Sequence, residues 1–413
     1  MKKNKTIAIH IQSEVQFYSI EPVLRFLKKK PYNMIILIER HEKNEEGHKE
    51  RSMGVVQLMK EYGYSPKYSE DYLDKEFDLC LTPYIDGMVK AKCYLKYEYG
   101  SLNTKPVLTY IPSILKGFHG FLCPATDGVN LLSIYGRTFP VDNLRFLGKK
   151  RVVNKGRKKI VLYAPTYNDE YDINEDRRII AELKKKYYVI IKAHHGIKFL
   201  KKNMAKNGVL KENADEYYGS EVNLIDLMMR ADICLANCSS VIGDAMRAGV
   251  PCAVYTHDID AFRWLDFHST QYDLYRSGEL LICSNPSKLL EVIDKVSTKT
   301  YMKKWNKLSD RFFPKEYRTG VKGYLEVIDY YLDNPEAQKV IMLHDHYLLE
   351  QRNEIKMREE LIDEMDRYIK ALEREREDLT KRLDSFSRKK LYRMVGAVYG
   401  VGRKIVKRRI IHN

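Results

Sequence analysis

Short apolar runs alternate with amphipathic segments along most of the chain. In the first half, the run at 5–11 is rich in β-branched residues and predicts a strand, and a segment with helical spacing follows at 19–29. Further strands are expected at 34–38 and 77–84. Strands that alternate with helices are typical of a parallel, doubly wound sheet. We therefore expect residues 1–150 to form a Rossmann-like α/β domain.

The same alternation restarts after a basic segment at 148–159, which contains two glycines and is expected to link two domains. The strands expected beyond it lie at 160–165, 187–193, 232–237, 251–255 and 279–284. Residues 151–335 are thus expected to form a second domain of the same class. Twin α/β domains are the plan of a nucleotide-dependent transferase with a cleft between its lobes, although fold alone does not settle function.

The period of the pattern changes to heptads beyond residue 345. Most seam positions of the best register are apolar, while the other faces are dense in Glu, Arg and Lys. Isoleucine at a and leucine at d favour a parallel two-stranded coil. We therefore expect residues 345–387 to form a coiled coil that joins two copies into a homodimer. The alternative is one long helix packed on its own globular domain.

Positive charge is concentrated at the end of the chain. Lys and Arg number 72 and Asp and Glu 56, which gives a net charge of +16, and residues 388–413 contain nine of the basic residues and no acidic one. Basic clusters alternate there with apolar residues at helical spacing, which is typical of a helix in the headgroup region of an anionic membrane. The alternative is a solvated, frayed tail. No nucleic-acid motif accompanies the charge, so no nucleic-acid partner is expected.

Cysteine usage and hydropathy indicate the compartment. The seven cysteines are scattered, without a C-x-x-C pair, and several lie in apolar runs where cysteine acts as a small hydrophobic residue. The basic amino terminus lacks the apolar core of a signal peptide, and no uncharged apolar stretch approaches the ~20 residues that a membrane span needs. We expect a cytoplasmic protein that is peripheral on the inner face of the membrane.

The most informative stretch for chemistry is a strand that ends directly before two serines and a helix. Ser239 and Ser240 follow the strand expected at 232–237. The unpaired N–H groups and the positive dipole end at a helix start can hold a phosphate, and two hydroxyls add hydrogen bonds. The alternative is that one serine simply caps the helix.

Two other strand ends supply polar side chains. Lys192 and His194 are two residues apart at the end of one strand, so that both point to one side in an extended chain, and Thr166 follows another strand. A lysine and a histidine beside a phosphoryl group can neutralise developing charge or move a proton. The alternative is a surface lysine, a structural histidine and a turn. Zinc is disfavoured because His194 and His195 lack partners at ligand spacing.

These strand ends, in this order, resemble the CDP-glycerol glycerophosphotransferase family, the teichoic acid polymerases and primases of Gram-positive cell walls. The family has strand–Ala-Pro-Thr-aromatic, then strand–Lys-x-His-Pro, then Asp-Tyr-Ser-Ser-Val-x-x-Asp, then Pro, a strand and Tyr-x-x-Asp. The matching residues here are Ala164–Tyr167, Lys192–His194, Ser239–Val241 with Asp244, and Pro251 with Tyr255–Asp258.

The resemblance implies a two-domain GT-B fold, with residues 1–150 on the acceptor side and residues 151–335 binding the nucleotide. It implies that Ser239, Ser240, Lys192 and Thr166 contact the donor phosphates, and that Asp244 and Asp258 are further cleft candidates. It also implies His194 as a catalytic residue and a CDP-activated donor, with no catalytic metal or other cofactor.

The chain departs from the family in several places. The family's first lobe carries Trp-His-Gly-Thr-Pro-x-Lys, whose histidine is a candidate general base. This chain has Tyr-Ile-Pro-Ser-Ile-Leu-Lys-Gly-Phe-His-Gly at 110–120, so that His119 is the substitute candidate or the motif has been replaced. The family's arginine after Pro-Thr-aromatic is Asn168, and its Asp-Tyr before Ser-Ser is Asn237-Cys238. A related but distinct donor or acceptor is therefore possible.

The expected function is the transfer of glycerol phosphate, or a related polyol phosphate, from a CDP-activated donor to a lipid-linked acceptor in teichoic acid or other cell-surface polymer synthesis. The first alternative keeps the two lobes and makes the chain a GT-B glycosyltransferase that uses a nucleotide sugar for surface or capsular polysaccharide. The second is a non-catalytic membrane scaffold, in which the coiled coil and tail assemble other enzymes.

Overall fold

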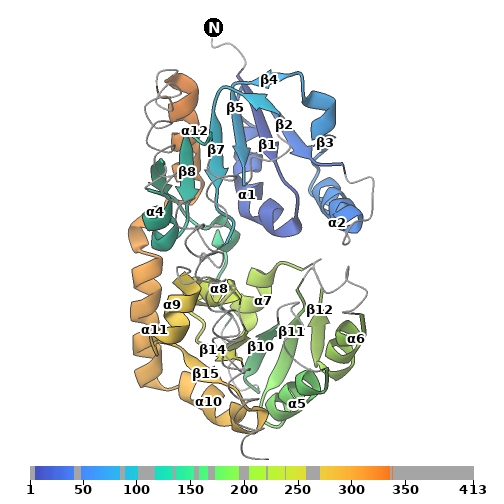
Figure 1. Cartoon of the computed structure of the whole chain (residues 1–413), viewed down its shortest axis with the longest axis vertical. Helices are drawn as coiled ribbons and strands as arrows, with labels where there is room; N and C mark the ends of the chain where they lie inside the picture. Colours follow the sequence, from blue (N-terminus) through green and yellow to red (C-terminus); the bar gives the residue numbers. More distant parts are fainter. Residues whose placement is uncertain are drawn as a thin grey trace, which may run out of the picture. The chain divides into compact units, whose positions relative to one another are not determined.

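A computed structural model of the chain describes residues 5–40, 48–83, 89–100, 117–133, 136–152, 158–165, 173–194, 204–219, 222–237, 239–256, 270–334 and 337 (Figure 1). The chain divides into two compact units, Met1–Asp345 and His346–Asn413. The second unit lies outside the described residues. The predicted coiled coil at 345–387 and the basic tail at 388–413 therefore stay predictions.

A seven-stranded parallel sheet forms the first lobe, in the order β3-β2-β1-β5-β7-β8-β9. Its strands are β1 (Thr6–His10), β2 (Asn33–Ile38), β3 (Lys67–Tyr68), β5 (Leu79–Thr82), β7 (Tyr94–Tyr97), β8 (Gly120–Cys123) and β9 (Arg137–Pro140). A small pair, β4 (Glu76–Phe77) and β6 (Lys90–Ala91), lies apart from it in hydrogen bonding. Because every pair in the large sheet is parallel, all its carboxyl ends lie along one edge.

The helices of the first lobe are α1 (Glu14–Leu27), α2 (His48–Glu61) and α4 (Thr126–Leu132), with the short 3-10 turns η1 (Ser69–Tyr72) and η2 (Leu144–Phe146). Helix α1 begins five residues earlier than the sequence pattern predicted, because Ser13 caps it by accepting a hydrogen bond from the Gln16 N–H. Pro22 therefore lies inside the helix instead of in its first turn. Phe17 and Leu24 of α1 are fully buried in the lobe's core.

A six-stranded parallel sheet forms the second lobe, in the order β12-β11-β10-β13-β14-β15. Its strands are β10 (Ile160–Ala164), β11 (Tyr188–Lys192), β12 (Glu216–Tyr218), β13 (Ile233–Ala236), β14 (Cys252–Tyr255) and β15 (Leu281–Cys283). The five strands that the sequence predicted for this half are confirmed, each within two residues at either end. β12, a strand of three half-buried residues, was not predicted.

Helices and short 3-10 turns surround the second sheet, and Figure 1 shows α5 and α6 beside β11 and β12. They are α5 (Ile173–Lys184), α6 (Met204–Asn213), α7 (Leu224–Arg230), α8 (Val241–Ala248), α9 (Thr270–Arg276), η6 (Pro286–Lys288), α10 (Leu289–Val296), α11 (Lys299–Phe312) and η7 (Lys315–Tyr317). The buried residues of sheet and helices form one hydrophobic cluster, separate from that of the first lobe.

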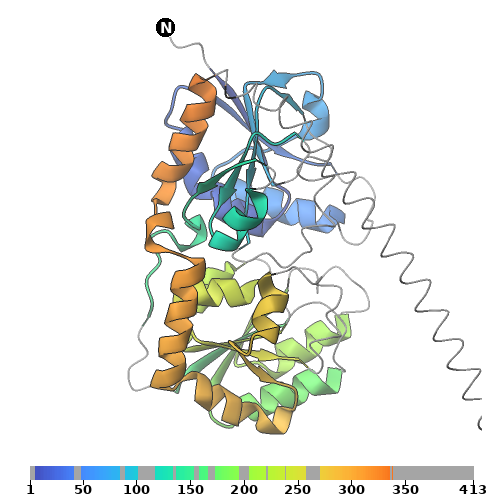
Figure 2. The ribbon, with the colours of Figure 1, turned by 60° about the vertical axis from the view of Figure 1, so that its left-hand side comes forward.

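The last described helix, α12 (Gly320–Asp333), belongs to the first lobe, although the sequence analysis assigned it to the second. Its apolar face packs in the first lobe's core, where Tyr324 and Ile328 are almost fully buried together with residues of β1 and α1. Figure 2 shows this helix beside the first sheet, at the end of the orange stretch that includes α11. The chain therefore crosses between the lobes twice, near 141–152 and near 313–320.

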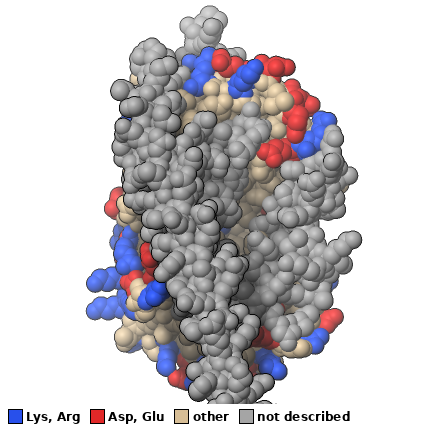
Figure 3. Space-filling model, viewed as in Figure 1, with Lys and Arg blue, Asp and Glu red and all other residues tan. Residues whose placement is uncertain are grey.

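The described surface carries both signs of charge. Figure 3 shows acidic and basic side chains next to one another on the part of this face where residues are coloured. Six cysteines of the described residues are buried and free. Of the helices in the described ranges, none has the length and apolar character needed to cross a membrane.

Candidate functional site

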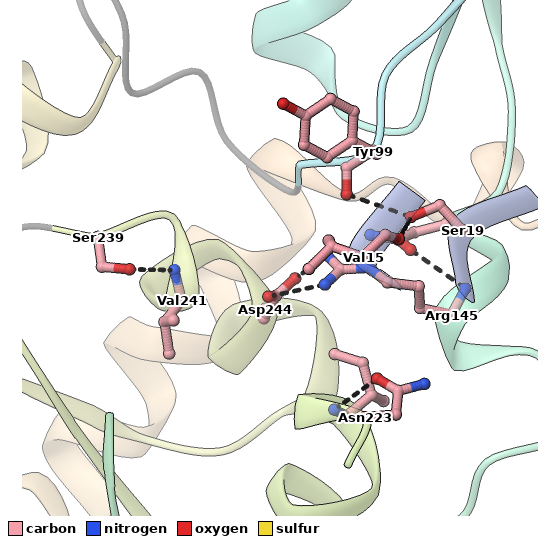
Figure 4. Close-up of polar contacts among 10 residues, drawn as sticks. Val15, Ser19, Tyr99, Arg145, Asn223, Ser239, Val241 and Asp244 are labelled. Atoms are coloured by element: carbon pink, nitrogen blue, oxygen red, sulfur yellow. Dashed lines mark hydrogen bonds and ion pairs between the residues drawn. The ribbon is translucent and has the colours of Figure 1, made fainter. Parts of the chain in front are cut away.

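Ser239 and Ser240 lie where the sequence placed them, between the carboxyl end of β13 and the start of α8. The Ser239 hydroxyl accepts a hydrogen bond from the Val241 N–H at 3.3 Å, so that this serine closes the turn into the helix (Figure 4). Ser240 occupies the cap position but makes no side-chain cap bond. Both serines are half-buried. The capping interpretation thus holds for Ser239, while the Ser240 hydroxyl takes no part in capping.

Lys192 and His194 extend from the neighbouring part of the same sheet edge. Lys192 ends β11, and its ammonium group donates to the Ala193 carbonyl at 3.1 Å. Both side chains are half-buried. β10 lies between β11 and β13 and is parallel to both, so the carboxyl ends of the three strands are adjacent. The structure therefore brings Lys192, His194, Ser239 and Ser240 to one edge of the second sheet.

Two predicted site residues, Thr166 after β10 and Asp258 after β14, lie outside the described residues. The strands that precede them in the sequence, β10 and β14, end at the same edge of the sheet as β11 and β13. In the described part of the chain, no three His, Cys, Asp or Glu side chains gather closely enough to hold a metal ion. The expectation that catalysis needs no metal stays a prediction.

Asp244 of α8 is 3% exposed, and its carboxylate accepts from both terminal nitrogens of Arg145, one of them at 3.2 Å. Arg145 lies in η2, within the first crossing between the lobes, and Figure 4 shows its side chain reaching α8. One helical turn further on, Arg247 donates to Asp142 at 2.8 Å. These two ion pairs are reciprocal, since each segment contributes one arginine and one aspartate. Asp244 thus has a buried basic partner, which the sequence did not reveal.

A set of tyrosines that the sequence did not mark as site candidates lies at the same edge of the second sheet. Tyr163, near the end of β10, donates to Asp176 at 2.8 Å, and Tyr255, at the end of β14, donates to Glu175. Tyr275 of α9 donates to the Asn237 carbonyl at 3.0 Å. The available signal was a tyrosine close to the end of two apolar runs, IVLYAP and CAVYT. These bonds hold the first turn of α5 and the end of β13 at the edge where the predicted site residues lie.

His119 lies at the opposite edge of the first sheet from the strands' carboxyl ends. It directly precedes β8, so it is at the amino edge. Its ring Nδ1 accepts from the Tyr94 N–H at 3.0 Å, and its carbonyl accepts from the Tyr331 hydroxyl of α12 at 2.6 Å. Gly120 leaves space for that contact, because a Cβ at this position would come within 2.9 Å of the Tyr331 hydroxyl. The structure thus gives the His119-Gly120 pair a packing role and does not bring it to the other candidates.

His10 ends β1 at the carboxyl edge of the first sheet and is 1% exposed. Within the part of the chain that the structure describes, neither ring nitrogen has a hydrogen-bond partner. Burial lowers the pKa of His10 from 6.5 to about 4, against the opposing effect of the Glu70 carboxylate. The sequence analysis did not select this histidine, because a lone histidine at the end of an apolar run carries no motif.

Comparison with known sequences gives one family for the second lobe. Residues 142–320 match the family described as CDP-Glycerol:Poly(glycerophosphate) glycerophosphotransferase. The teichoic acid glycerol-phosphate primase of Bacillus subtilis (strain 168) is 28% identical to the chain over 177 residues, which are 39% of this chain and 44% of the primase. The aligned part therefore spans less than half of either protein. These matches confirm the resemblance that the strand ends indicated.

Comparison with solved structures concerns the fold. The S. aureus MnaA protein, solved with UDP, is similar with a TM-score of 0.51 and 11% identity over 80% of this chain and 97% of that chain. The glycotransferase of kitacinnamycin has a TM-score of 0.52 and 10% identity over 80% of this chain and all (100%) of that chain. The two-lobed α/β, GT-B-like architecture is therefore confirmed.

Proposed function

We propose that this chain, which belongs through residues 142–320 to the CDP-glycerol:poly(glycerophosphate) glycerophosphotransferase family, transfers glycerol phosphate or a related polyol phosphate from a CDP-activated donor to a lipid-linked acceptor. The polymer under synthesis would be a teichoic acid or another cell-surface polymer. One observation carries the proposal: within the matched region, Lys192, His194, Ser239 and Ser240 come from two strands to one edge of the second sheet. Ligands bind at that edge in open α/β sheets.

The reaction requires charge neutralisation at the donor diphosphate. The acceptor oxygen forms a bond to the phosphorus that bears the polyol, the bond from that phosphorus to the bridging oxygen breaks, and CMP leaves. The Lys192 ammonium group and the start of α8 favour the negative charge that develops on CMP. The Ser240 hydroxyl and Thr166 add hydrogen bonds to the phosphates. His194 is the catalytic histidine on the donor side, where it donates a hydrogen bond or a proton to the departing phosphate.

In this proposal, the first lobe supplies the acceptor side of the site. The segments beyond residue 345 bring the enzyme to the membrane. A coiled coil at 345–387 would join two copies, and the nine basic residues of 388–413 would attract the anionic inner face of the membrane, where a lipid-linked acceptor is presented. The enzyme would be cytoplasmic and peripheral. Asp258 is kept as a donor-side candidate on the family's pattern alone.

A nucleotide-sugar transferase remains the second candidate, and one observation favours it. The first lobe lacks the family's Trp-His-Gly motif, and His119, the nearest substitute, lies at the amino edge of its sheet with its ring bonded to the backbone. A changed acceptor side is compatible with a changed donor.

Calorimetry with CDP, CMP, CDP-glycerol, CDP-ribitol, UDP-sugars and GDP-sugars separates the candidates. We expect CDP and CDP-polyols to bind and UDP- and GDP-sugars to fail, and Lys192→Ala to weaken CDP binding at least tenfold. Asp226→Ala, which changes a surface carboxylate of α7, is the matched control and should leave binding unchanged. A wild-type protein that binds neither CDP nor CMP would contradict the proposed function.

A further inference from the structure

Among the described residues of the first lobe, His10 has a buried imidazole whose two ring nitrogens both lack a hydrogen-bond partner. His10 lies at the carboxyl end of β1, in register with Leu37 of β2, and its side chain is on the sheet face opposite to the α1 core. A buried donor or acceptor that is left without a partner destabilises the fold. At neutral pH the ring has one N–H donor and one free acceptor nitrogen, and neither is satisfied.

Glu39 lies beside this imidazole at a distance that a single oxygen atom can bridge. Its Oε1 is 4.0 Å from His10 Nε2, which is too long for a hydrogen bond. An oxygen about 2.8 Å from each of the two atoms would bond to both. The same carboxylate oxygen accepts from the Gln12 amide at 2.5 Å, and its side chain is 24% exposed. The pair therefore reaches from the buried imidazole to the surface.

The charges around the pair select the kind of ligand. Glu39 and Glu70 are the carboxylates that act on His10, and a second anion such as a phosphate oxygen would be repelled by them. A hydroxyl group fits, because it can accept a hydrogen bond from the His10 Nε2–H and donate one to the Glu39 carboxylate. A hydroxyl that donates to Glu39 is also in the position from which that carboxylate can take its proton.

The site lies on the side of the first lobe that meets the second. α1 begins three residues after the end of β1, and Figure 4 shows its first turns, at Val15 and Ser19, beside Arg145, whose guanidinium group bonds Asp244 of α8. The negative charge of Asp226 in α7 also contributes to raising the pKa of Tyr18 in α1. The interactions of α1 therefore link the carboxyl edge of the first sheet to α7 and α8 of the second lobe.

We propose that His10 and Glu39 bind the acceptor hydroxyl and that Glu39 is the general base of the transfer, an inference that rests on the proposed function. The hydroxyl accepts a hydrogen bond from the His10 Nε2–H and donates one to the Glu39 carboxylate. The hydroxyl oxygen forms the new bond to phosphorus while its proton moves to Glu39, and the bridging oxygen leaves with CMP. The proton returns to solvent after CMP departs. His10 and Glu39 together take the place of the histidine that the family carries in its Trp-His-Gly motif, while His194 serves the leaving group.

His10→Asn and Glu39→Gln test this proposal in the full-length protein. We expect Glu39→Gln to lower kcat for transfer from CDP-glycerol at least 100-fold and His10→Asn about tenfold, while the Kd for CDP changes less than twofold. Ile9→Val is the matched control, since it alters the same strand on its other face, and it should lower the Tm without lowering kcat. Unchanged kcat in both variants, with only the Tm lowered, would mean that a structural water fills the site and would overturn the proposal.

A second measurement separates this inference from the donor chemistry. In the wild-type protein with isotope-labelled histidine, the His10 ring signals, assigned by their loss in His10→Asn, should shift when glycerol is added. The shift should be absent in Glu39→Gln. A protein that fails to bind CDP but shows this shift would retain the polyol site and lose the proposed donor. A protein that binds CDP and shows no glycerol-dependent shift would lose the His10 site alone.

Discussion

Arg145 and Asp244 form an ion pair whose side chains are 5% and 4% exposed, and it joins η2 to the helix that follows the two serines. A buried ion pair is costly to desolvate, and the removal of one partner leaves an uncompensated buried charge. Together with the pair of Asp142 and Arg247, it fixes α8 to the segment around η2. The start of α8 is therefore positioned by residues of both lobes.

Asp244→Ala should destabilise the protein by about 3–5 kcal/mol, because Arg145 would stay buried without its partner. Urea denaturation followed by circular dichroism measures this difference. Asp226→Ala removes the partner of Lys149 in a pair whose side chains are 36% and 46% exposed, and it should cost less than about 1 kcal/mol. Equal losses in the two variants would contradict the strong coupling that we assign to the buried pair.

The pH dependence of stability should carry the signature of His10. Its pKa is about 4 in the folded protein and 6.5 in a solvated chain, so the unfolded state binds the proton first as the pH falls. Its contribution is complete above pH 6.5 and is lost on acidification to pH 4, by about 3 kcal/mol in total. Folded carboxylates with lowered pKa, such as Glu216 and Asp294, lose their contribution only at more acidic pH.

Urea midpoints measured from pH 7.5 to 4.5 test this expectation. His10→Asn has no group that titrates at this position, so its stability should fall less over that interval than that of the wild type. Parallel curves for the two proteins would mean that folding does not lower the pKa of His10, contrary to the effect of the burial described above.

Gly120→Ala should destabilise the first lobe by about 1–3 kcal/mol. A Cβ at this position would approach Phe139 Cε2 and the Tyr331 hydroxyl to 2.9 Å each, and Tyr331 is held in place by burial and by its bond to the His119 carbonyl. Thermal unfolding measures the effect. Gly63→Ala is a poor control because Gly63 has a φ of +76°, whereas Gly208→Ala, with open space around it, should leave the Tm unchanged or raise it.

Deletion of 388–413 should lower the binding of the protein to anionic liposomes, because nine basic residues are removed with no acidic one. The loss should be larger at low salt, where electrostatic attraction is screened less. Sedimentation with liposomes of anionic and of neutral lipid measures both effects. Unchanged sedimentation of the shortened protein with anionic liposomes would remove the membrane part of the proposal.

The alternation of apolar runs was sufficient to predict the strands of the second lobe, because a buried parallel strand is apolar on both faces and reads directly as a run. Residue order at the strand ends then placed Lys192, His194, Ser239 and Ser240 at one edge, since parallel strands share that edge. The lobe to which α12 belongs could not be predicted in this way. Its apolar face fits either core, and the choice depends on contacts with β1 and α1 some 300 residues away in the chain.

Side-chain partners were also beyond the sequence. Asp244 was assigned to the cleft by its place in a motif, and only the fold shows that Arg145, 99 positions earlier, holds its carboxylate. His119 was selected because a glycine follows it, as in the family's His-Gly pair. It directly precedes β8 and therefore lies at the amino edge of the first sheet, whereas the other candidates lie at the carboxyl ends of strands. His10 carries no motif, and what distinguishes it is burial without a partner, a property of the folded state alone.

The route of the chain through α12 has a consequence for its synthesis. The second lobe is encoded without interruption from about residue 150 to 312, so it can complete its core while the ribosome is still at work. The first lobe cannot complete its core at that stage, because Tyr324 and Ile328, which pack beside α1, have not yet left the exit tunnel. The lobe that is synthesised first is therefore the one that completes its folding last. A nascent chain paused before residue 320 would expose the apolar surface that α12 covers, and chaperones could bind it.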